Sequence, residues 1–316
     1  MTNTTAVKDT LLAIVELDCI PDTLIDRTAW IARNFDYQVH LVLFEPNSVE
    51  LLGRFPISSE AQQIRQDMEQ AQTELVEDYA NRLREAGIDV TTSVLQRRPL
   101  ADGILEINSA VEPKVVVKAT LFHSAAERGT LVDSDWQLMR ACPYPLWLVK
   151  ADNMAENPVI VAAVDPSNTH DKPAVLDHEI IRAAKAIAQR SEGDLHLLHT
   201  YERLAGIGAA AGMAFKSGKL PIDEIDARVK SEHRIALDVL AETNDIDTDH
   251  AHQLPGRAEE ILPAFARSQN AGLVVMGVLA RWGLKRMIIG STAERVIDHI
   301  ASDILIVRLG DYQIYE

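Results

Sequence analysis

The sequence predicts an α/β protein built from two tandem, open, parallel-sheet domains with helices on both faces of each sheet. Three observations predict this fold. The chain has 316 residues, about twice a common domain size. Short apolar segments alternate with helical segments along it. This alternation occurs twice, and most later strands recur 156 or 158 residues after their first-copy partners.

The first element of each copy is an apolar run that an acidic residue closes, at residues 11–18 and 159–165. Nearly unbroken apolar, β-branched sequence predicts a strand that is buried on both faces. An alanine-rich helix follows, at 27–34 and at 180–190, and then a second strand, at 39–43 and at 195–199. Strands that are apolar on both faces indicate a parallel sheet covered by helices.

The repeat continues to the end of each copy. Long amphipathic helices are expected at 64–86 and 225–242, and further strands at 115–118 and 273–276. A last strand is expected at 146–149 and again at 304–307. The polar segment 151–157, which ends at Pro158, joins the copies, so we expect domains over 1–153 and 154–316.

Composition excludes several classes of function. Hydrophobic residues make up 47% and charged residues 25%, as in ordinary folded proteins. The formal net charge is -16, and both halves carry excess acid, which argues against nucleic acid as a partner. No apolar run approaches the roughly 18 residues that span a bilayer, which argues against integral membrane association.

The N-terminus and the cysteines predict a cytoplasmic protein. Residues 1–10 are polar and lack the profile of a secretory signal. Cys19 and Cys142 are too few for a disulfide framework or a thiolate metal site. Two buried, apolar-like thiols in a reducing compartment are favoured over a linking disulfide or a reactive thiol.

One region has the pattern of a ligand site. Gly277 follows a strand, and Gly290-Ser291-Thr292 opens a helix. Ser291 or Thr292 can cap that helix, whose first backbone N–H groups can bind an anion, and Gly290 lets the backbone approach a phosphate. The glycine spacing alone is a weak signal of a ligand site, because a plain turn followed by a helix cap has the same spacing and is more common.

The order of these pieces resembles the universal stress protein family. Its nucleotide-binding members carry Gly-x2-Gly-x9-Gly-(Ser/Thr), which Gly277, Ala280, Gly290 and Ser291 match here with alanine in the second glycine place. The segments 256–261 and 292–299 and the terminal strand also resemble the family. The likeness covers nearly the whole chain, and the tandem form, with segments 133–136 and 142–147, is similar to the E-type members of bacteria.

The resemblance implies an adenine-nucleotide α-hydrolase-like fold, a cytoplasmic location and a role in stress survival. It also implies pairing through the last strand. Because each copy has such an apolar strand, we predict an internal pseudo-dimer through 146–149 and 304–307, with a homodimer as the alternative. Protein partners are not identified by any motif.

Departures from the family motif differ between the copies. The Ala280 methyl group is expected to weaken phosphate approach in the second copy. The first copy has Ala119, Phe122, Val132 and Asp133 at the four motif places. Asp133, together with Asp135, is expected to repel phosphate, so the first domain is predicted not to bind ATP.

The favoured function is a non-enzymatic stress-response protein with an adenine-nucleotide site, for ATP or a relative, in the second domain. Backbone N–H groups of Gly277, Gly290 and Ser291 and the hydroxyls of Ser291 and Thr292 would bind phosphates. The resemblance places Asp165 near the adenosine. A slow ATPase, a hydrolase of a lipid or nucleotide, and a ligand-free interaction module are the alternatives. No catalytic residue and no metal site is assigned.

Three other features have two interpretations each. The first is a set of histidines in the second strands, His40, His196 and His199. They either face a cleft at the carboxyl ends of the strands or are half-buried structural residues, and the structural interpretation is favoured. His250 and His252 could together hold Zn²⁺, although a solvated edge of the sheet is favoured. The small-residue segment 204–218 is equally a mobile lid or a packed helix. For Arg97 and Arg98, surface ion pairing is expected.

Overall fold

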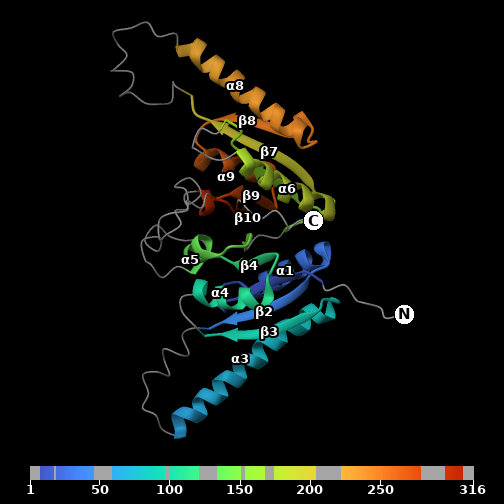
Figure 1. Cartoon of the computed structure of the whole chain (residues 1–316), viewed down its shortest axis with the longest axis vertical. Helices are drawn as coiled ribbons and strands as arrows, with labels where there is room; N and C mark the ends of the chain where they lie inside the picture. Colours follow the sequence, from blue (N-terminus) through green and yellow to red (C-terminus); the bar gives the residue numbers. More distant parts are fainter. Residues whose placement is uncertain are drawn as a thin grey trace, which may run out of the picture. The chain divides into compact units, whose positions relative to one another are not determined.

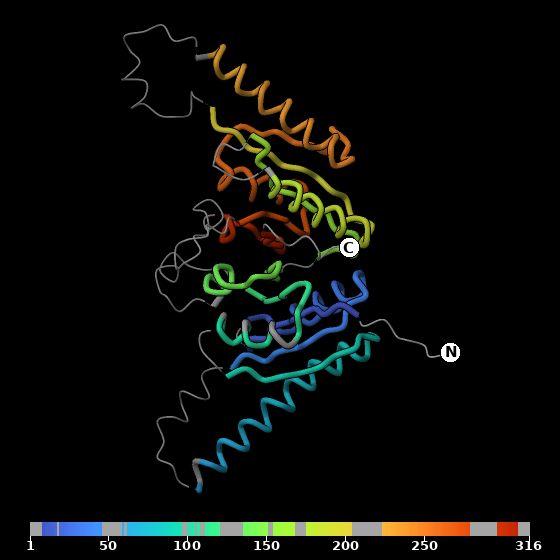
Figure 2. The backbone as a smooth tube through the Cα atoms, in the orientation of Figure 1, coloured from blue at the N-terminus to red at the C-terminus, as the bar shows by residue number. Residues whose placement is uncertain are grey.

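The computed structural model describes residues 8–17, 19–45, 59–96, 100–120, 134–150, 154–167, 174–203, 222–278 and 296–308. The chain divides into two compact units that adjoin in sequence at residues 151–152. Each unit is a twisted parallel sheet with helices packed on it (Figures 1 and 2). The tandem α/β architecture predicted from the sequence is confirmed.

Unit 1 has a parallel sheet in the strand order β3-β2-β1-β4-β5. Its strands are β1 (Thr10–Val15), β2 (Gln38–Phe44), β3 (Val90–Leu95), β4 (Val115–Ala119) and β5 (Leu146–Val149). Its helices are α1 (Pro21–Phe35), α3 (Ser59–Glu85), α4 (Leu100–Val111) and α5 (Ser134–Ala141). Helix α3 runs along β3 and β2 and also contacts α1, whereas α4 and α5 contact one another.

Unit 2 repeats this order as β10-β9-β6-β7-β8, again with parallel pairing. Its strands are β6 (Val159–Ala163), β7 (Asp194–Tyr201), β8 (Ala251–Pro255), β9 (Leu273–Gly277) and β10 (Asp303–Val307). Its helices are α6 (Ala174–Ser191), α8 (Ile222–Thr243), α9 (Ala258–Ser268) and the short 3₁₀ helix η3 (Thr248–His250). Pairing of the two units through β5 and β10 stays a prediction.

Burial on both faces explains why these strands are continuous apolar runs. Leu11, Leu12, Ala13 and Ile14 of β1 are all fully buried, and the central strand β6 of unit 2 is built the same way. Helix α9 contributes Leu262, Phe265 and Ala266 to the core, at helical spacing, while its other side faces solvent. Burial of apolar surface stabilises this layered arrangement by about 25 cal/mol for each Å² that is removed from water.

Several element boundaries differ from the sequence prediction. Helix α1 begins at Pro21, six residues earlier than expected, because proline suits the first turn of a helix. Strand β1 ends at Val15, before Glu16, and Asp18 lies outside the described residues. Strand β8, for which no range was predicted, begins at Ala251, so His252 lies in the third strand of unit 2.

Two other expectations have a mixed outcome. Cys142 is buried, and its Sγ–H donates to the Tyr144 carbonyl at 3.5 Å, but Cys19 is partly exposed, so the prediction of two buried thiols is wrong for Cys19. The segments 97–99 and 204–218 lie outside the described residues. Of the helices formed by the described residues, none is long and apolar enough to cross a membrane.

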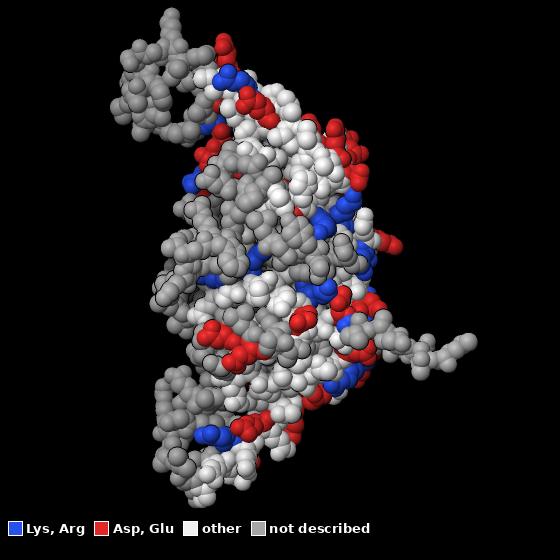
Figure 3. Space-filling model, viewed as in Figure 1, with Lys and Arg blue, Asp and Glu red and all other residues white. Residues whose placement is uncertain are grey.

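Acidic and basic side chains are interspersed on the described surface of both units in the view of Figure 3. Such a surface of mixed charge is typical of helices that face solvent. Exposed pairs such as Lys8 with Asp36, at 2.8 Å, contribute little to stability because water screens them.

Candidate functional site

The carboxyl ends of parallel strands are where open α/β sheets bind ligands, and the strand registers make this edge comparable in the two units. Ala13 pairs with Val117 in unit 1, and Ala162 pairs with Val275 at the same place in unit 2. Glu16 and Asp165, each three residues further along, therefore hold equivalent positions beyond the central strands.

At this edge of unit 2, hydrogen bonds orient Asp165, and its carboxylate stays partly exposed. The Ser167 hydroxyl donates to its Oδ1 at 2.7 Å, and its own backbone N–H donates to Oδ1 of Asp177, on α6, at 2.9 Å. The Asp165 side chain is 20% exposed. It is therefore fixed in orientation and still able to accept a hydrogen bond from a ligand.

A pair of histidines lies directly behind Asp165. His199 Nδ1 is 3.2 Å from the Val164 carbonyl oxygen and 3.9 Å from Asp165 Oδ1, while its Nε2 is 2.7 Å from His233 Nδ1, on α8. The two rings stack with centroids 5.0 Å apart. Since a carbonyl only accepts, Nδ1 of His199 carries the proton and Nε2 accepts from His233.

Burial lowers the pKa of His199 below the ordinary histidine value, against the opposing effects of the Val164 carbonyl and the Asp165 carboxylate. The side chain is only 1% exposed. The neutral ring therefore acts as a fixed hydrogen-bonding support beneath Asp165 and His233.

Gly277, at the end of β9, has a packing role that glycine spacing did not indicate. A β-carbon built on Gly277 would lie 2.8 Å from Leu176 and 3.0 Å from Ile180, both on α6. The missing side chain therefore lets α6 approach β9 closely. Ala119 at the same place in unit 1 is buried and carries the methyl group, so the helix there must pack differently.

The equivalent edge of unit 1 is occupied by a buried cluster of charges. Lys118 Nζ lies 2.6 Å from Glu16 Oε2 and is ion-paired with Asp135, and it also donates to the Ala119 carbonyl at 3.0 Å. The Thr120 hydroxyl donates to Asp135. The Lys118 side chain is 1% exposed.

The charge of Lys118 is stable in this cluster. Burial alone would lower the pKa of Lys118, but the Asp135 and Glu16 carboxylates outweigh it and raise that pKa above the ordinary lysine value. Asp135 is paired with Lys118, but Lys118 also pairs with Glu16, so the three groups together keep one net negative charge and the expected repulsion of phosphate stays a prediction. The Glu16 carboxylate is paired with the buried Lys118 and its side chain is 11% exposed, about half as much as that of Asp165.

The site residues predicted from the sequence have different outcomes. Asp165 and Gly277 both lie at the carboxyl edge of unit 2, beyond β6 and at the end of β9. Ala280, Gly290, Ser291 and Thr292 lie outside the described residues, as do Phe122, Val132 and Asp133.

The favoured interpretation of the histidines agrees with the structure for His40 and His196, which are half-buried near the amino ends of β2 and β7 and do not face a cleft at the carboxyl ends. Only His199 lies near that edge, and it is fully buried. Sequence reasoning missed Lys118 and His233. A lysine inside an otherwise apolar strand was the available signal for Lys118, whereas nothing on α8 distinguished His233.

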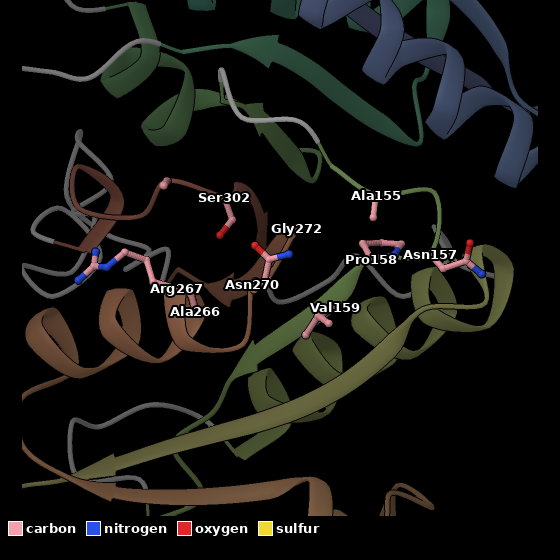
Figure 4. Close-up of a pocket in the computed structure, with 11 residues that line it drawn as sticks. Ala155, Asn157, Pro158, Val159, Ala266, Arg267, Asn270, Gly272 and Ser302 are labelled. Atoms are coloured by element: carbon pink, nitrogen blue, oxygen red, sulfur yellow. The ribbon is translucent and has the colours of Figure 1, made fainter.

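A cavity of about 430 Å³ in unit 2 opens at the amino ends of its strands (Figure 4). Pro158 and Val159 at the start of β6, Gly272 before β9 and Ser302 before β10 line it. In Figure 4 the guanidinium of Arg267 points away from the other labelled polar groups. This cavity is thus at the edge opposite Asp165 and is separate from the predicted site.

Comparison with known proteins agrees with this architecture. Residues 157–308 match the model of the Universal stress protein family. Universal stress protein E of Photorhabdus laumondii is 28% identical over 253 residues, which cover 79% of this chain and 78% of the relative. The Universal stress protein E homolog of Haemophilus influenzae is 25% identical over 249 residues, or 78% of this chain and 79% of the relative.

Solved structures share the fold over nearly the whole chain. A protein of unknown function from Pseudomonas aeruginosa PAO1 has a TM-score of 0.71 and 24% identity, covering 98% of this chain and 94% of the other. A universal stress protein from Archaeoglobus fulgidus has a TM-score of 0.63 and 17% identity, covering 95% of this chain and 98% of the other.

Lys118→Met is expected to destabilise unit 1 by about 3–5 kcal/mol, because it leaves two buried carboxylates without their cation. Urea unfolding followed by tryptophan fluorescence measures this, since Trp30, Trp136 and Trp147 lie in unit 1. Lys8→Met, which removes an exposed ion pair, is the control and should change stability little. Equal stability of the two variants would contradict the role of Lys118.

His199 is expected to make the protein less stable in acid. Because the pKa of His199 is lowered in the folded state, its contribution is complete above the ordinary value near pH 6.5 and is lost as the pH falls through the folded value. Thermal unfolding at pH 7.5 and pH 5.5 should therefore show a smaller drop in His199→Gln than in wild type. His299→Gln is the control, and the same drop in both variants would refute the assignment.

Proposed function

We propose that this chain is a tandem, E-type member of the universal stress protein family and a stress-response protein that binds an adenine nucleotide in unit 2 alone. The nucleotide would lie across the carboxyl edge of the sheet, with the adenosine near Asp165 and the phosphates at residues 290–292. The contrast between Asp165 and Glu16 is the observation that carries the proposal.

At this edge the two units offer opposite chemistry to a ligand. The Asp165 carboxylate is oriented by Ser167 and partly exposed, so it can accept hydrogen bonds from the hydroxyl groups of a ribose. The Glu16 carboxylate is buried against Lys118. A ligand in unit 1 would have to displace this ion pair and leave charges without partners, which is costly.

The support behind Asp165 favours a preformed site. His199 and His233 form a hydrogen-bonded pair, and Tyr201 packs its ring 5.6 Å from that of His233. Groups whose orientation is already fixed lose little entropy when a ligand binds. Backbone N–H groups at the start of the helix that the sequence predicts after Gly290 would then bind phosphate without a basic side chain.

A direct test is to extract the purified protein with acid and separate the released nucleotides by chromatography. Recovered ATP supports the proposal. Recovered ADP alone would favour the alternative of a slow ATPase. If nothing is recovered and calorimetry detects no binding of added ATP, the ligand-free interaction module replaces the proposal.

Three variants are expected to change ATP binding in different directions. Gly290→Val should abolish it, because a β-branched side chain would block the helix N-terminus, and Ala280→Gly should strengthen it. Asp165→Asn should weaken it about tenfold or more, the usual effect of losing a charged acceptor. Isothermal titration of ATP into each folded variant measures these changes.

The equivalent position of unit 1 supplies the control. Val132→Gly restores the glycine there but leaves Lys118 in place, so it should not create a second binding event. Unchanged affinity in both Gly290→Val and Asp165→Asn would show that the nucleotide binds elsewhere. A second equivalent of ATP in Val132→Gly would show that Lys118 does not close unit 1.

A further inference from the structure

Three imidazole rings converge near the amino ends of β7 and β8, at the edge of unit 2 opposite Asp165. His196 Nδ1 lies 2.9 Å from His252 Nε2. The ring of His196 is centred 4.8 Å from that of His250 and 5.1 Å from that of His252. Asp194 adds a carboxylate, with Oδ2 3.1 Å from His196 Nε2 and Oδ1 3.4 Å from His250 Nδ1.

The internal repeat shows that this convergence is built into the strand register. His40 is the unit 1 equivalent of His196, and its two ring nitrogens bond to the hydroxyls of Thr91 and Ser93 at 2.8 and 2.9 Å. Val42 pairs with Ser93, as Leu198 pairs with His252, so Thr91 and Ser93 match His250 and His252. Both units therefore direct two neighbouring side chains at a central histidine, and only unit 2 makes all three of them imidazoles.

We propose that His196, His250 and His252 form a binding site for a divalent transition-metal ion of the Zn²⁺, Ni²⁺ or Cu²⁺ type. Imidazole nitrogen is a preferred ligand of these ions. Two nitrogens bound to a tetrahedral Zn²⁺ are about 3.3 Å apart, so His196 Nδ1 and His252 Nε2 need to separate by about 0.4 Å. Both rings must also turn, so that their lone pairs point at the ion and not at one another. The site does not depend on the proposed nucleotide.

Hydrogen bonding already fixes one ligand in the tautomer that a metal needs. His196 Nε2–H donates a hydrogen bond to Asp194, which leaves the lone pair of Nδ1 facing His252. A carboxylate that orients a ligating histidine in this way is common around bound zinc. His252 then donates its Nε2 proton to His196, and metal binding requires that proton to move to Nδ1 of the same ring.

The surroundings allow access for an ion. The guanidinium of the neighbouring Arg234 is held by the Ala251 carbonyl and by Asp238. His250 borders a surface cavity of about 260 Å³ that Asp245, Asp247 and Lys185 also line. Lys185 pairs with Asp245 at 3.5 Å, which leaves Asp247 as the carboxylate that favours the entry of a cation.

His250 must move to complete the site. Among the residues that the structure describes, no group of three or more histidine, cysteine or acidic side chains surrounds a common point as metal ligands do. The His250 side chain is 44% exposed and contacts Asp194, so its ring can turn toward the other two. Water would supply the fourth ligand.

The test is titration of the full-length chain, without a polyhistidine tag and after treatment with chelator, by ZnCl₂ in isothermal calorimetry. One equivalent is expected to bind to the wild type. His196→Gln and His252→Gln should each weaken binding at least tenfold, and Asp194→Asn about tenfold. His40→Gln is the matched control in unit 1 and should bind as wild type does, and circular dichroism checks that each variant is folded.

Cobalt absorption gives a readout that does not depend on affinity. Co²⁺ in the wild type should show the visible bands of nitrogen and oxygen ligands, and these should disappear in His196→Gln. Unchanged Zn²⁺ affinity in His196→Gln and His252→Gln, or no binding to the wild type, would overturn the proposal. It would also fail if sulfur-to-cobalt charge transfer implicated a cysteine, or if only His233→Gln abolished binding.

Discussion

Parallel pairing between strands that are buried on both faces fixes where the polar side chains of this chain lie. Successive residues of a strand point to opposite faces, so a slip of one residue would exchange the faces of a whole strand. In β7 this separates His196 from His199, which are three residues apart. His199 meets His233 of α8 on one face, and His252, the partner of His196, contacts Phe265 of α9 on the other. The same strand thus supports two unrelated clusters at its two ends.

The two units also show how one scaffold can keep or lose a ligand site. In unit 1, Lys118 is buried beside Glu16 and Asp135, and both carboxylates depend on this one cation. A buried ion cluster of this kind need not stabilise the fold more than apolar side chains would, but the loss of one member is costly. The closed state of unit 1 therefore resists single substitutions. In unit 2, Met276 at the place of Lys118 brings no charge, and Asp165 stays partly exposed.

The fold could be predicted from the sequence because its information is local and repeated. Each strand is a short apolar run, and the displacement of 156 residues that relates His40 to His196 also holds in the structure. The chemistry of the sites could not be predicted in the same way, since it depends on contacts between distant residues. Lys118 and Asp135 are brought together by the end of β4 and the start of α5. His233 lies in the middle of α8. The periodicity of that helix predicts which of its faces is buried, but it does not predict that His199 of β7 is the residue that His233 contacts.

The histidine positions show why a register is more informative than a motif. An imidazole packed against a neighbouring strand needs partners for both ring nitrogens, since an unsatisfied buried polar group costs about 1–3 kcal/mol. Unit 1 meets this need for His40 with two hydroxyls, which can donate or accept and therefore satisfy either tautomer. In unit 2, His196 instead meets an imidazole and a carboxylate, so its tautomer is fixed and a proton is shared between two rings. The hydroxyls around His40 supply its hydrogen bonds and are poor ligands for a transition metal. The imidazole of His252 supplies a hydrogen bond to His196 only while neither ring is bound to a metal. Exchange of Thr91 and Ser93 for His250 and His252 therefore changes a purely structural contact into one that an ion can displace.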